Sequence, residues 1–144
     1  MVCPRLHAPI TINLSMRVST FLMFHGAAEE AMKRYVSLIP NSRIVAIERY
    51  GPGESGKEGT TKQAVFELNK TRLMCIDSPV KHPFTFTPAT SLFIDCDDPA
   101  QIDHLFECLS EGGQILMPLG SYDFSHRFGW VQDKYGISWQ LNLP

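Results

Sequence analysis

Hydrophobic positions recur along the chain with two different periods, and these periods predict ten elements. Apolar residues every three or four positions predict amphipathic helices at 27–39 and 99–111. Short segments rich in aliphatic and β-branched residues predict eight strands. These strands are expected at 17–24, 43–50, 62–69, 72–77, 90–96, 114–119, 127–133 and 137–143.

The second helix has clear signals at both ends. Asp98 is an N-cap candidate, Pro99 fits the first helical position, and Gln101 completes a capping box. Gly112 and Gly113 follow the last apolar position and end the helix. The helix is therefore expected to begin at Pro99.

The two halves of the chain have the same element order: a strand, a helix and three strands. Tyr35 and Phe106 occupy equivalent helix positions. We therefore predict an α+β fold of two βαβββ modules, at about 17–77 and 90–143, in one domain over 16–144. Residues 1–15 have no clear period and are expected to be an N-terminal extension. The two modules side by side would form a curved mixed sheet with helices outside and a binding cleft inside.

The composition argues against nucleic-acid-binding and membrane-spanning classes of protein. Among 144 residues, 44% are hydrophobic and the net charge is −2. The near-neutral charge offers no electrostatic footprint for nucleic acid, and no apolar segment reaches the roughly 20 residues of a membrane span. Cysteines stand at 3, 75, 96 and 108, with no CxxC spacing. Reduced thiols are expected, which predicts a cytoplasmic protein.

Four stretches carry a family resemblance: FLMFHGAAEEAMKRYVSLIP, RYGPGESGKEGT, LMCIDSPVKHPFTFTPATSLFIDC and SEGGQILMPLGSYDFSHRFGWVQDKYGISWQLNL. They resemble the PhnB-like branch of the vicinal oxygen chelate superfamily, which includes glyoxalases, bleomycin-resistance proteins and extradiol dioxygenases. The resemblance implies a glyoxalase-like fold of paired βαβββ modules, a homodimer with two clefts, and a small-molecule ligand.

The superfamily holds a divalent metal with ligands from the first and last strand of each module. The resemblance places these positions at Thr20, near Met74, at Ser91 and at Gln140. A divalent metal prefers carboxylates, imidazoles or thiolates, and these four side chains offer none of them. We therefore expect no metal at the usual position and no other cofactor.

Side-chain alternation predicts which residues line the cleft. The apolar sides, including Phe21 and Met23, should pack on the helices, and the mixed sides should face the cleft. Trp130 is expected to form one end of the cleft. Met74 and Asp77, from the fourth strand, are also expected to line it. The full set of expected cleft residues is Thr20, Leu22, Phe24, Met74, Asp77, Ser91, Phe93, Trp130, Ser138 and Gln140. Neutral hydrogen-bonding groups among aromatics suit a small, partly apolar ligand. Alternatively, Ser138, Gln140 and Asn142 simply face water.

Two other functions stay open, and the sequence assigns no catalytic residue. One is a metal-dependent glyoxalase- or dioxygenase-type enzyme with an irregular site that uses Asp77, His82 or Asp95. The other is a methyltransferase, because the PhnB-like branch often carries the label 3-demethylubiquinone-9 3-methyltransferase. No glycine-rich turn between a strand and a helix is present to bind S-adenosylmethionine, which disfavours methyl transfer.

Overall fold

Ten elements follow one another in the predicted order. The structure is a computed structural model that describes residues 16–144, so the expected extension at 1–15 lies outside the described residues. In chain order the elements are β1 (Thr20–Phe24), α1 (Ala28–Leu38), β2 (Arg43–Arg49), β3 (Thr61–Leu68), β4 (Thr71–Asp77), β5 (Ser91–Asp95), α2 (Pro99–Ser110), β6 (Gln114–Tyr122), β7 (Ser125–Gln132) and β8 (Ser138–Leu143).

The capping box of α2 is confirmed. The Asp98 side chain accepts a hydrogen bond from the Gln101 backbone N–H at 2.8 Å. The Gln101 side chain in turn accepts from the Asp97 backbone N–H, also at 2.8 Å. Two backbone donors at the helix start are thus satisfied by side chains, which fixes where α2 begins. Neither helix in 16–144 has the length and hydrophobicity needed to cross a membrane.

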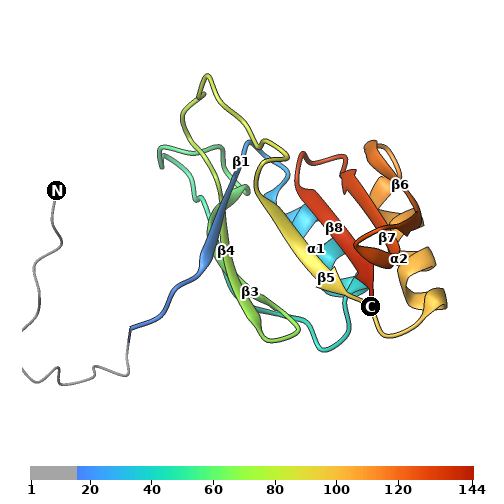
Figure 1. Cartoon of the computed structure of the whole chain (residues 1–144). Coiled ribbons are helices and arrows are strands. Elements are labelled where there is room, and N and C mark those ends of the chain that lie inside the picture. Colours follow the sequence, from blue (N-terminus) through green and yellow to red (C-terminus); the bar gives the residue numbers. More distant parts are fainter. Residues whose placement is uncertain (1–15) are drawn as a thin grey trace, which may run out of the picture.

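The strands form two four-stranded mixed sheets, one in each module (Figure 1). The strand order is β1-β4-β3-β2 in the first module and β5-β8-β7-β6 in the second. In each module the first and last strands pair in parallel and the other pairs are antiparallel. The α+β fold of two βαβββ modules is therefore confirmed.

Helix α2 packs closely against the sheet of the second module. Strand register places Leu141 opposite Gly129 and Trp139 opposite Val131, all on the side that α2 covers. A Cβ atom at Gly129 would lie 2.6 Å from the Phe106 ring, so only glycine leaves room for this ring.

Helix α1 lies between the two sheets and joins the modules (Figure 1). Its Tyr35 is fully buried, packs edge-on against Trp139, and donates its hydroxyl to Asp133 at 2.5 Å. The Arg34 guanidinium donates to the Cys108 backbone carbonyl at 2.8 Å. These contacts fix the orientation of the second module relative to the first.

Candidate functional site

Five of the predicted cleft residues meet on one side of the second sheet. The register pairs Ser91 with Ser138 and pairs Phe93 with Gln140. Gln140 is also opposite Trp130 on β7. Because residues paired across strands point to the same face, all five side chains share the side that α2 leaves uncovered. We call this side the open face of the second module.

A chain of hydrogen bonds forms the polar part of this open face. The Gln140 side-chain amide donates to Ser91 Oγ at 3.1 Å. Ser91 Oγ lies 2.6 Å from Ser138 Oγ, which also accepts from the Trp130 indole N–H at 2.8 Å. These bonds leave Gln140 Oε1 without a donor among residues 16–144, so this oxygen can accept a hydrogen bond from a ligand.

Aromatic side chains surround Gln140 and make a hollow of about 320 Å³. It is lined by Phe93, Met117, Phe124, Phe128, Trp130, Gln140 and Asn142. Phe93 is 56% exposed and Phe124 is 67% exposed, whereas Phe128 between them is buried. Exposed aromatic rings beside satisfied polar groups are typical of a small-molecule or interaction surface.

The predicted face of β1 is wrong and needs correction. Leu22 and Phe24 belong to the hydrophobic core, and Phe21, expected to pack on a helix, is 51% exposed. The register explains this, because Leu22 pairs with the buried Cys75 and Phe24 pairs with the buried Asp77. Both sides of β1 carry large apolar residues, so alternation alone could not decide which side faces the core.

Asp77 also departs from its predicted place, because its carboxylate is 3% exposed and engaged by the backbone. One oxygen accepts from the N–H groups of Gly26 and Ala28 at 2.6 and 3.1 Å. The other accepts from the Thr61 N–H at 2.9 Å. Asp77 therefore holds the start of α1 against β3. Met74 pairs with the exposed Phe21. Both side chains lie on the side of the first sheet away from the buried Leu22 and Cys75, which we call the open face of the first module.

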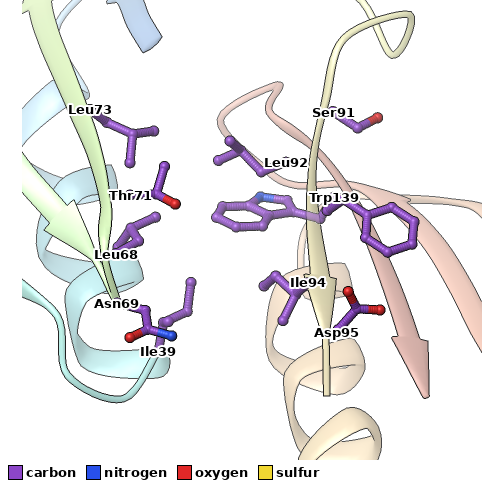
Figure 2. Close-up of a pocket in the computed structure, with 11 residues that line it drawn as sticks. Ile39, Leu68, Asn69, Thr71, Leu73, Ser91, Leu92, Ile94, Asp95 and Trp139 are labelled. Atoms are coloured by element: carbon purple, nitrogen blue, oxygen red, sulfur yellow. The ribbon is translucent and has the colours of Figure 1, made fainter. Parts of the chain in front are cut away.

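The helix-covered sides of the two sheets face each other across a cavity of about 440 Å³, whose lining is mostly apolar but includes Asn69, Thr71, Ser91 and Asp95. Figure 2 shows Leu73 pointing from β4 toward Leu92 and Trp139 of the second module. The two open faces of one chain must therefore point away from each other. Thr20, Leu22 and Ser91 line an adjoining hollow of about 340 Å³ along β1 and β5. The ten predicted cleft residues are thus spread over several places. Five share the open face of the second module, Thr20 and Leu22 line the hollow between the modules, Met74 lies on the open face of the first module, and Phe24 and Asp77 are buried.

The donor atoms of the open face do not fit a divalent metal. Gln140 and Ser91 offer neutral oxygens, and Ser138 is already bonded to Trp130. Across residues 16–144, no group of three or more His, Cys, Asp or Glu side chains is arranged to hold an ion. Imidazole, thiolate or carboxylate ligands would be needed at these positions.

The three residues considered for an irregular site, Asp77, His82 and Asp95, do not come together as a metal-binding group within residues 16–144. The Asp95 carboxylate accepts from the Asn142 side-chain amide at 2.9 Å. His82 lies between β4 and β5, where its Nε2 is 2.9 Å from Ser78 Oγ. Asp77 holds backbone N–H groups, as described above.

The family described as 3-demethylubiquinone-9 3-methyltransferase matches residues 16–142. The chain belongs to this family. Among solved structures, this PhnB-like chain is similar to the PhnB protein of Bacillus cereus at 56% identity, covering 90% of this chain and all of that one, with a TM-score of 0.88. A Pseudomonas aeruginosa protein is 25% identical over 90% of this chain and 98% of its own, with a TM-score of 0.77.

More distant structures show the fold alone. The fosfomycin resistance protein FosX of Listeria monocytogenes, in a structure with manganese(II), is 10% identical. The similarity covers 91% of this chain and 94% of that one, with a TM-score of 0.62. The chain thus shares its fold with this fosfomycin resistance protein. No curated protein matches the chain.

Proposed function

We propose that this PhnB-like protein binds a small, partly apolar molecule on the open face of its second module. The observation that carries the proposal is the aromatic hollow lined by Gln140, whose Oε1 has no donor among residues 16–144. Exposed rings such as Phe93 gain apolar contact with a ligand, and Gln140 Oε1 orients it through a hydrogen bond.

The lining of the hollow defines the class of ligand. None of the seven lining residues carries a charge. A charged ligand would lose hydration here without meeting an opposite charge. The preferred ligand is therefore a neutral molecule with an apolar or aromatic body and one hydrogen-bond donor.

We further propose that the open face works without the superfamily's divalent metal. The neutral oxygens of Ser91 and Gln140 support this proposal, because they bind such an ion weakly in comparison with carboxylate or imidazole groups. Elemental analysis of dialysed protein provides the test. A stoichiometric divalent metal that is retained by the native chain and lost in Gln140→Leu would contradict the proposal.

We propose that two copies complete the site. β1 and β5 each lie at an edge of their sheet, and each carries an exposed phenylalanine, Phe21 or Phe93. Placing β1 of one copy beside β5 of another would bring two open faces together and cover the exposed rings. Light scattering should give the mass of a homodimer, and Phe21→Glu should shift it toward the monomer. A monomeric native protein would contradict this arrangement.

Native mass spectrometry of the purified protein tests the binding proposal. We expect a small molecule to be retained by the native protein and lost in Gln140→Leu, which keeps the side-chain size and removes the amide. Gln114→Leu, on the exposed start of β6 outside the hollow, should retain it. Equal retention by both variants, or none by the native protein, would contradict the proposal.

Methyl transfer is the second candidate, favoured by the description of the family whose pattern spans residues 16–142. Calorimetry with S-adenosylmethionine tests it, and saturable 1:1 binding would support it over simple ligand binding.

We also propose a cytoplasmic location for the protein. The free thiols of Cys75, Cys96 and Cys108 favour this location, because thiols stay reduced there.

A further inference from the structure

Two histidines far apart in the sequence meet beside the end of β1, outside the open face. His25 follows β1 directly, and His82 lies on the segment between β4 and β5. Their ring centroids are 6.0 Å apart, and both rings line a hollow of about 440 Å³. We propose that His25 and His82 form a two-imidazole site for a divalent transition-metal ion such as nickel or zinc.

The hydrogen bonds of Ser78 determine which nitrogen of His82 is free. Ser78 Oγ donates to the Val80 carbonyl at 2.9 Å, so its single hydrogen is used there. Its contact with His82 Nε2 at 2.9 Å must therefore be a bond that the imidazole N–H donates. His82 is then protonated on Nε2 and keeps its lone pair on Nδ1. A ligating histidine typically donates its other ring N–H to a neighbouring oxygen in this way.

The spacing of the two rings is close to that of two ligands on one ion. A metal–nitrogen bond of about 2.0–2.1 Å places each ring centroid about 3.2 Å from the ion, so two rings on a tetrahedral ion lie about 5.2 Å apart. The observed 6.0 Å is larger by about 0.8 Å, so the exposed His25 ring has to move toward His82 when an ion binds. Phe84 stacks on His82 with ring centroids 4.8 Å apart, which holds the imidazole in place before an ion binds.

The remaining coordination positions are open to water. Ser78 Oγ is already engaged, and the adjacent Asp77 carboxylate accepts only from backbone N–H groups. Lys81 lines the same hollow, and its ammonium group repels a cation. Removing this charge should therefore strengthen metal binding, whereas it would weaken binding of an anion at the same place.

Calorimetry with Ni²⁺ on the full chain, without a purification tag, tests the site. Paramagnetic broadening of the histidine ring protons in NMR spectra identifies the ligands. We expect saturable binding with broadening of His25 and His82. His25→Ala and His82→Ala should each weaken binding at least about tenfold, and Ser78→Ala should weaken it about 10–100-fold. Lys81→Ala should tighten it.

His104→Ala is the matched control, because His104 is exposed on α2 with Cys108 Sγ 3.7 Å from its ring and offers another pair of metal ligands. It should bind Ni²⁺ like the native chain. The proposal is overturned if nickel does not bind, if His25→Ala and His82→Ala bind it unchanged, or if broadening is confined to His104. Circular dichroism should show each variant folded.

Discussion

At the scale of single residues, two buried carboxylates organise the two modules. Asp77 holds the start of α1 in the first module. In the second, Asp133 accepts from the backbone N–H groups of Tyr135 and Ile137 and from the Trp139 indole N–H. It also accepts from the Tyr35 hydroxyl of α1. A buried carboxylate with donors on both oxygens stabilises the local turn and the contacts that meet there.

Replacing Asp133 with asparagine should therefore destabilise the protein. The side-chain NH₂ of asparagine would replace one of the two accepting oxygens of Asp133 and would face hydrogen-bond donors. At least one buried donor would therefore lose its acceptor. We expect the free energy of unfolding to fall by about 2–3 kcal/mol, measured by urea denaturation. Asp123→Asn, in the exposed turn after β6, should change it by less than about 0.5 kcal/mol. An equal, small effect of both substitutions would contradict this role.

The cysteines should differ in their reactivity toward thiol reagents. Burial and the nearby Asp77 raise the pKa of the Cys75 thiol to about 12. Burial and neighbouring aspartates raise the pKa of the Cys96 thiol to about 11. Because the thiolate is the reactive form, only the partly exposed Cys108 should react rapidly in a folded Cys3→Ser background. Mass spectrometry after brief labelling checks this, and fast labelling of Cys75 would contradict it.

At the scale of elements, the close contact between α2 and β7 depends on Gly129. The Phe106 ring of α2 occupies the space where a β-carbon would stand. Gly120 on the neighbouring strand β6 has open space at the same place. Substitutions at these two glycines can therefore be compared. The comparison distinguishes the cost of overpacking against Phe106 from the general effect of replacing a glycine in a strand.

Gly129→Ala should push α2 away from the sheet. We expect the free energy of unfolding to fall by about 1–3 kcal/mol because the added methyl group overpacks the core. Gly120→Ala should be nearly neutral, since its methyl group meets no neighbour within 4 Å. Thermal unfolding of both variants checks the prediction, which fails if they have the same melting temperature.

At the scale of the whole molecule, the hydrogen bond from the Tyr35 hydroxyl to the Asp133 carboxylate joins the two modules. Burial and the Asp133 carboxylate raise the pKa of Tyr35 above its usual range. In the unfolded chain a tyrosine ionises near pH 10. Above that pH the unfolded state releases a proton that the folded state keeps. The free energy of unfolding must then fall as the pH rises.

Tyr35→Phe should flatten this alkaline loss of stability. The variant starts from a lower stability at neutral pH, because it lacks the bond to Asp133, and then loses less between about pH 9 and pH 11. Urea denaturation across this range measures the slope. Tyr122→Phe, whose hydroxyl is exposed, should keep the native slope. An unchanged slope in Tyr35→Phe would show that Tyr35 does not cause the alkaline loss.

The elements and their order could be predicted from the sequence, because helix and strand periods and the Asp98 cap are local signals, and because the same element order recurs in both halves of the chain. The sequence also determined the polar face of β8, where Gln140 alternates with the apolar Trp139 and Leu141. It could not decide the face of β1, since both of its sides are apolar. The roles of Asp77 and Asp133 and the meeting of His25 with His82 were decided by the tertiary structure alone. Each joins residues distant in the chain, and no local period records which segments pack together.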